Sequence, residues 1–135
     1  MTMPAPVTVF VCTSCKRPIE GGAEPFGTPG RDFAAAIAAR LASEGTPVPI
    51  LIEPIECLAV CKRALTIALS GEGRFMYLIG DLDPAIHLDD VVSASKAYAA
   101  TDNGIVPWRE RPQTFRKGVV ARIPPLGFKQ PEPVT

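Results

Sequence analysis

The sequence lacks any long apolar run, and its start lacks a targeting signal. No stretch reaches the roughly 18 apolar residues that a membrane-spanning helix needs. The first six residues lack the basic start and apolar core of a secretory signal. A chain of 135 residues can also bury the core of one domain without disulfides. These absences predict a cytoplasmic protein with no membrane partner, whose cysteines stay reduced.

An excess of charge of either sign is also missing. Fourteen basic and 14 acidic side chains cancel, which argues against nucleic acid as a partner. The distribution is uneven, however, because residues 105–135 hold six basic side chains against two acidic ones. The basic ones are Arg109, Arg111, Arg116, Lys117, Arg122 and Lys129. An acidic body is therefore followed by a basic tail.

The spacing of apolar residues predicts the order strand, helix, strand, hairpin, helix. The expected elements are strands at 7–11 and 48–55, a helix at 32–44, hairpin strands at 64–69 and 75–79, and a helix that begins at Asp83-Pro84 and ends near Asn103-Gly104. Residues 18–30 hold three prolines and four glycines, which predicts an irregular surface loop. Prolines in the second strand place it near an edge of the sheet. A right-handed crossover makes the first two strands parallel, and the hairpin adds an antiparallel pair. The sequence thus predicts an α/β, thioredoxin-like fold with a central mixed four-stranded sheet.

A domain spanning residues 1–104 is expected, followed by a tail at 105–135 that is rich in proline and has no long periodic pattern. We expect this extended tail to dock on the domain through its apolar residues, which are Trp108, Phe115, Val119, Val120 and Phe128. Trp108 also stands among arginines, so an alternative hypothesis makes it a docking patch for a partner. Burial is the commoner use of a large aromatic side chain.

Only four cysteines are present, and they form two close pairs, Cys12 with Cys15 and Cys57 with Cys61. Each pair follows an apolar segment that predicts a strand. In a reducing compartment such pairs indicate metal binding or catalytic thiols more often than disulfides. If the two strands are neighbours, four thiolates meet at one end of the sheet. Soft sulfur ligands of this kind suit zinc or an iron-sulfur cluster.

The residues around the cysteines favour a cluster over zinc. Zinc knuckles are usually C-x-x-C pairs, often with glycine, whereas the second pair encloses three residues and neither pair contains glycine. Both pairs precede a Lys-Arg dipeptide, Lys16-Arg17 and Lys62-Arg63. Positive charge there would suit a 2Fe-2S centre, whose net charge is about −2, and would raise its reduction potential. Two solvated loop ends explain the same dipeptides equally well, so both interpretations stay open.

Five segments resemble those of a bacterial family of small predicted metal-binding proteins related to the thioredoxin-like 2Fe-2S ferredoxins. They are Val7–Cys15, Glu56–Arg63, Arg74–Pro84, Gly104–Pro112 and Ala121–Pro125. The resemblance implies a thioredoxin-like fold, a 2Fe-2S cluster held by Cys12, Cys15, Cys57 and Cys61, and often a homodimer. The family's genes tend to lie among those for cobalamin synthesis and cobalt handling. The better known ferredoxins separate their first two cysteines by a longer loop, so Cys15 departs from their pattern.

These observations predict a 2Fe-2S protein for electron transfer or redox sensing, not itself an enzyme, that works with a redox partner protein. A zinc-binding protein of metal trafficking is one alternative. A thioredoxin-like thiol-disulfide oxidoreductase is the other, but such enzymes begin a helix at the cysteine pair, whereas Pro18 and two glycines soon follow Cys15. The lone histidine, His87, has no ligand spacing with the cysteines and predicts a surface or capping role. Asp81, Asp83, Asp89 and Asp90 are interpreted as carboxylates at a helix start.

Overall fold

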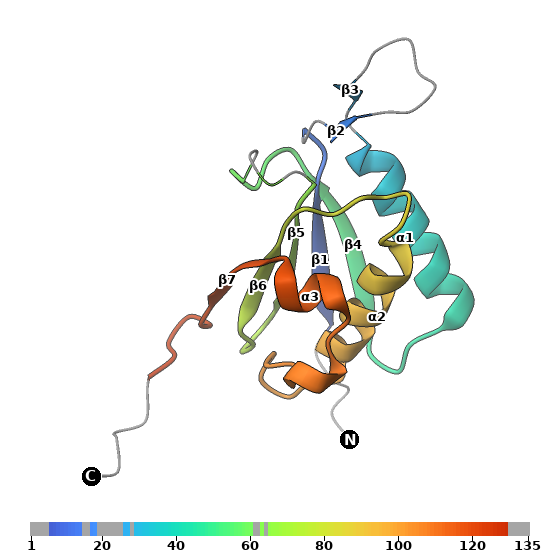
Figure 1. The fold of residues 1–135 in the computed structure, drawn as a ribbon. Coiled ribbons are helices and arrows are strands. Elements are labelled where there is room, and N and C mark those ends of the chain that lie inside the picture. Colours follow the sequence, from blue (N-terminus) through green and yellow to red (C-terminus); the bar gives the residue numbers. More distant parts are fainter. Residues whose placement is uncertain are drawn as a thin grey trace.

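The computed structural model describes residues 6–14, 29–60, 63 and 65–129, together with the backbone of 17–18 and 26–27. Its strands are β1 (Val7–Cys12), β2 (Arg17–Pro18), β3 (Phe26–Gly27), β4 (Ile50–Ile55), β5 (Ile67–Gly71), β6 (Met76–Ile79) and β7 (Val119–Ile123) (Figure 1). Its helices are α1 (Gly30–Glu44), α2 (Leu88–Ala99), the 3-10 helix η2 (Trp108–Glu110) and α3 (Gln113–Lys117). No described helix is long and apolar enough to cross a bilayer.

One mixed sheet forms the centre of the described chain, with the strand order β4-β1-β5-β6-β7. β1 and β4 run parallel, and the other neighbours are antiparallel. Helices α1 and α2 lie against one face of the sheet (Figure 1). Successive side chains of a strand point to opposite faces, so every second residue faces the core between sheet and helices. In β1, Val7, Val9 and Val11 are buried, whereas Thr8 and Phe10 are half-buried. The expected α/β architecture is confirmed, and so is the edge position of the proline-bearing strand β4.

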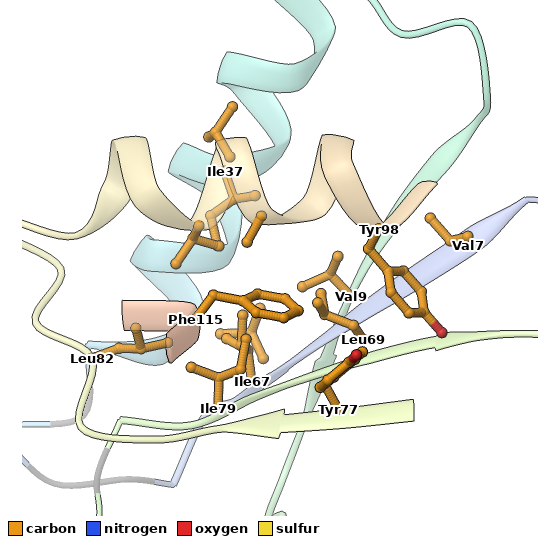
Figure 2. Close-up of a cluster of buried hydrophobic side chains, with 14 of the residues drawn as sticks. Val7, Val9, Ile37, Ile67, Leu69, Tyr77, Ile79, Leu82, Tyr98 and Phe115 are labelled. Atoms are coloured by element: carbon orange, nitrogen blue, oxygen red, sulfur yellow. The ribbon is translucent and has the colours of Figure 1, made fainter. Parts of the chain in front are cut away.

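The core lies between this face and the helices. Figure 2 shows Tyr77 and Tyr98 near Leu69, and Phe115 among the buried side chains. The Tyr98 hydroxyl donates to the Phe75 carbonyl at 2.5 Å, and burial raises the pKa of Tyr98 to about 12. The buried Arg74 donates from Nη1 to the carbonyls of Tyr98 and Ala99, both at 3.1 Å. A guanidinium therefore satisfies the carbonyl end of α2, where positive charge is favourable.

The final long helix begins later than the sequence predicts. The Asp83 carboxylate accepts a hydrogen bond from the Ala85 N–H, and the Asp83 N–H donates to His87 Nδ1 at 2.8 Å. These bonds form a separate turn, and α2 begins only at Leu88. Asp83 is thus not its N-cap, because its side chain closes a local turn instead. Ile86 is 70% exposed in that turn, although an apolar residue in the predicted helix would be expected to pack against the core.

The segment after residue 104 is more ordered than an extended tail. It contains η2, α3 and β7, and β7 pairs with β6, so the sheet of the described chain has five strands instead of the expected four. Phe115 is fully buried 4.8 Å from the Tyr77 ring, as expected. The expected burial of Trp108 is wrong, because its side chain is 61% exposed. Phe128 is exposed but lies edge-on to Phe75, with ring centres 5.0 Å apart.

The glycine- and proline-rich region also departs from the prediction. Arg17–Pro18 and Phe26–Gly27 pair as a short antiparallel ribbon, β2 with β3, where an irregular loop was expected. Residues 19–25 and 28 lie outside the described part of the chain.

Phe115→Ala tests the integration of the C-terminal segment into the core. Removing a fully buried ring should lower the free energy of unfolding by about 3–5 kcal/mol. Leu126→Ala in the same segment is the matched control, because that side chain is fully exposed and should change the value by no more than about 0.5 kcal/mol. Urea denaturation followed by circular dichroism measures both. Equal small effects would show that the segment contributes nothing to the core.

Candidate metal centre

Two of the four cysteines lie at neighbouring strand ends. Cys12 is the last residue of β1 and is paired with Ile55, the last residue of β4. Past the strands, the Thr13 N–H donates to the Ile55 carbonyl at 2.8 Å, and the Ser14 N–H donates to the Glu56 carbonyl at 3.1 Å. The parallel pairing therefore continues to the residue before Cys57. The prediction that the strands before the two cysteine pairs are neighbours is confirmed.

The two sulfur atoms have different surroundings. Cys12 is 1% exposed, and its Sγ lies 3.7 Å from the Glu56 carbonyl oxygen and 3.8 Å from Ser14 Oγ. Cys57, in contrast, is exposed at the surface. The site thus has a buried side at the end of β1 and a solvent-facing side after β4.

The other half of the predicted ligand set cannot be placed. Cys15 and Cys61 lie outside the described residues, and so do Lys16 and Lys62. Within the described ranges, no group of three or more His, Cys, Asp or Glu side chains could hold a metal ion. Ligation by all four cysteines therefore stays a prediction.

Gly30 lets the start of α1 approach the Cys12 backbone closely. A Cβ atom at this position would lie 2.0 Å from the Cys12 carbonyl oxygen and 2.8 Å from Thr13 Cα. Any residue other than glycine would push α1 and the end of β1 apart. The sequence prediction begins the helix at Asp32 and misses this residue, because Pro29-Gly30 is a turn signal and glycine disfavours a helix.

The loop after Cys57 has a strained backbone that directs an amide at the sulfur. Ala59 has a φ angle of 62°, in the left-handed region. Its N–H donates to Cys57 Sγ at 3.1 Å. The left-handed conformation costs a non-glycine residue about 1–2 kcal/mol. Strain of this kind is concentrated at functional sites, and hydrogen bonds to ligand sulfurs tune iron-sulfur centres.

The chain just past Cys61 is anchored to the loop that follows β6. Arg63 forms an ion pair with Asp81, at 2.8 Å from Nε and 2.7 Å from Nη2 to Oδ2. The Asp81 N–H donates to the Arg63 carbonyl at 2.7 Å, with Asp81 in a left-handed conformation at φ 59°. Arg63 is therefore not a solvated loop end, and its charge is compensated by a carboxylate.

His87 and the nearby carboxylates serve the fold. His87 precedes α2, accepts the Asp83 N–H and lines a surface cavity of about 410 Å³, which agrees with the predicted surface or capping role. Asp89 and Asp90 lie in the first turn of α2, as expected of helix-start carboxylates. The same expectation is wrong for Asp81 and Asp83, which precede α2 and bond to Arg63 and Ala85. Asp89 also pairs with Arg40 of α1 at 2.7 Å.

Comparison with known proteins gives a family and a fold. The model of a family described as "Protein of unknown function (DUF1636)" matches residues 9–125. A thioredoxin-like [2Fe-2S] ferredoxin from Aquifex aeolicus has a similar structure, with a TM-score of 0.55, 17% identity, and coverage of 91% of this chain and 97% of that one. A second structure, of the wild-type thioredoxin-like [2Fe-2S] ferredoxin from Aquifex aeolicus, has a TM-score of 0.44 at 19% identity, with coverage of 64% and 81%. No curated protein matches the chain.

Ala59→Gly tests the strain in the loop after Cys57. Glycine tolerates the left-handed conformation, so the free energy of unfolding should rise by up to about 1 kcal/mol, whereas Ala59→Val should lower it by a similar amount. The control is Ala39→Gly, at an exposed position inside α1, which should lose about 1 kcal/mol. Chemical denaturation measures all three variants. Equal losses at positions 59 and 39 would exclude the left-handed conformation.

Proposed function

The chain belongs to the DUF1636 family of proteins of unknown function, and we propose that it holds a 2Fe-2S cluster and transfers single electrons. The ligands would be the thiolates of Cys12, Cys15, Cys57 and Cys61. The observation that carries the proposal is the pairing of β1 with β4, which brings the chain at Cys12 beside the residue before Cys57. The fold shared with a thioredoxin-like [2Fe-2S] ferredoxin supports it.

The described residues fit the chemistry of such a centre. Thiolates are the ligands that iron-sulfur clusters require. The Ala59 N–H already donates to Cys57 Sγ, and hydrogen bonds to ligand sulfurs tune the reduction potential of such clusters. Gly30 leaves room for α1 to begin against the Cys12 backbone, so that the first ligand is held by both a strand and a helix.

The buried and exposed sides of the site indicate from where a partner would approach. A bound 2Fe-2S cluster supplies a one-electron couple. Cys12 lies on the buried side, where it excludes water, and the exposed Cys57 faces solvent. A redox partner protein would therefore approach the loop after β4. Arg63 and Asp81 hold the chain past Cys61 and would keep that face in one conformation.

The alternatives receive less support from the described residues. A thiol-disulfide oxidoreductase needs an accessible, activated cysteine at a helix start. Here Cys12 is buried, and Arg17–Pro18 form a strand instead of a helix. The proposal accordingly assigns the protein no catalysis of its own. Zinc in a trafficking role would use the same thiolates, so metal analysis must decide between zinc and the cluster.

Three further parts of the proposal come from the family resemblance and the cysteine chemistry. The protein is expected to act in the cytoplasm, where thiols stay reduced. It is expected to form a homodimer, which light scattering on the purified protein would test. Its electrons are proposed to serve cobalamin or cobalt metabolism.

Anaerobic purification followed by an absorption spectrum and iron, sulfide and zinc analysis of one sample tests the proposal. We expect a coloured protein with two irons and two sulfides per chain, as the cluster formula requires, that dithionite bleaches. Cys57→Ser should lose most of the iron. Ser43→Ala, at an exposed position whose hydroxyl donates to the Arg40 carbonyl within α1, should retain it. Colourless protein with stoichiometric zinc, and no cluster after reconstitution, would refute the ferredoxin function in favour of zinc binding.

Gly30→Ala tests the support that α1 gives to the first ligand. The added methyl group meets the Cys12 carbonyl, so iron per chain after purification should fall severalfold. Ala35→Gly, at an exposed position in the same helix, controls for global destabilisation of about 1 kcal/mol. If both variants keep equal iron, the contact between Gly30 and Cys12 has no role in holding the centre.

A further inference from the structure

The exposed side chain of Trp108 departs from the usual burial of large aromatics. It is the only tryptophan in the sequence, and it is 61% exposed on η2. Phe115, seven residues later, is completely buried. The core of the described chain therefore does not need the Trp108 ring. An exposed tryptophan is a common anchor of protein interfaces.

The Trp108 ring is held in place by two arginines. The guanidinium carbons of Arg111 and Arg116 lie 5.6 Å and 5.7 Å from the ring centre. Arg116 Nε donates to the Trp108 carbonyl at 3.1 Å. Arg111 is itself fixed, because it donates to the Val106 carbonyl at 2.8 Å and to the Tyr77 hydroxyl at 3.1 Å. A ring already ordered loses little conformational entropy when it binds a partner.

The surface around the ring is positively charged. Arg109 is exposed next to Trp108 on η2, Arg111 and Arg116 lie against the ring, and Glu110 is the one carboxylate on η2. None of the ion pairs between described residues involves these cations. We define the Trp108 platform as Trp108, Arg109, Arg111 and Arg116. It combines tryptophan and arginine, two of the residue types enriched among interface hot spots, with cations that form no ion pair among the described residues.

The platform is remote from the cysteine-bearing strand ends. The turn after β5 lies at the start of β1, because Gly71 pairs with Val7, whereas Cys12 ends that strand. The segment that leads to η2 lies at that same end, because the Asn103 carbonyl accepts a hydrogen bond from the N–H of Phe75, which lies in this turn. Figure 1 shows η2 near this end and the exit of β1 at the other. A partner on the platform would not cover Cys57.

We propose that the Trp108 platform binds an acidic segment of a partner protein that carries an apolar side chain to lie on the indole ring. Carboxylates would pair with Arg109 and Arg116, and the apolar side chain would cover the exposed ring. Nucleic acid fits less well, because the first 104 residues are acidic and would repel a polyanion. A single aromatic ring also gives no series of stacking positions for successive bases. This inference does not depend on cluster binding.

Trp108 itself reports on occupancy, since all tryptophan emission comes from this one ring. The full chain is titrated at low salt with a short peptide of Glu-Glu-Leu repeats. We expect a saturable change in emission that weakens as salt is added. In anisotropy measurements with the labelled peptide, Arg109→Glu should weaken binding about tenfold and Trp108→Ala by more. The control Arg31→Glu, with the same charge change at an exposed position on α1, should bind like the wild type.

A polythymidine oligonucleotide and phosphatidylserine vesicles are the comparison ligands. Tighter binding of either one than of the peptide would overturn the proposal, as would no peptide binding at low salt or equal weakening by Arg31→Glu. Iron content and the absorption spectrum of Arg109→Glu should match those of the wild type, because the platform does not touch the cysteine-bearing end. Loss of the cluster in every variant would count against the proposed function and leave the platform proposal standing.

Discussion

The parallel pairing of β1 with β4 is the constraint on which the candidate centre depends. Its register sets Val7 opposite Ile50 and Cys12 opposite Ile55, so that the strands end together and the chain at Cys12 meets Glu56. A slip of one residue would reverse the alternation in β1 and turn its buried valines to the other face. The burial of those valines under the helices therefore fixes the position of the first cysteine. Core packing and site geometry have the same cause.

Charged groups complete the structure where the backbone leaves unpaired polar atoms. Arg74 satisfies carbonyls at the end of α2 from inside the core, and its desolvation is tolerated because both bonds are made. Arg111 does the same for the Val106 carbonyl and for the Tyr77 hydroxyl. Arg74 therefore ties the end of α2 to the turn between β5 and β6, and Arg111 ties the segment beyond α2 to β6. The C-terminal part of the described chain is thereby joined to the core by polar bonds as well as by Phe115.

Strongly periodic elements could be predicted from the sequence, and elements decided by tertiary contacts could not. The helix ending at Glu44 and the strands before both cysteine pairs follow from apolar spacing alone. β7 lies in a proline-rich segment with no long periodic pattern, and its pairing with β6 makes it a strand. The late start of α2 depends on the bonds that Asp83 makes with Ala85 and His87, which spacing cannot reveal. For the site, the residue types indicated the chemistry, whereas the roles of Gly30 and Ala59 appear only in three dimensions.

The two ends of the molecule differ in how they could bind. At the cysteine-bearing end, the loop at Ala59 carries backbone strain and the exposed sulfur of Cys57, which would suit a brief contact with the proposed redox partner. At the other end, the Trp108 platform is an ordered aromatic surface with fixed cations, which suits a longer-lived contact. A partner attached by a flexible acidic segment at the platform would meet the Cys57 loop at a high effective concentration. Transfer could then be fast without tight binding at the cysteine-bearing end, so the site that reacts need not be the site that holds the partner.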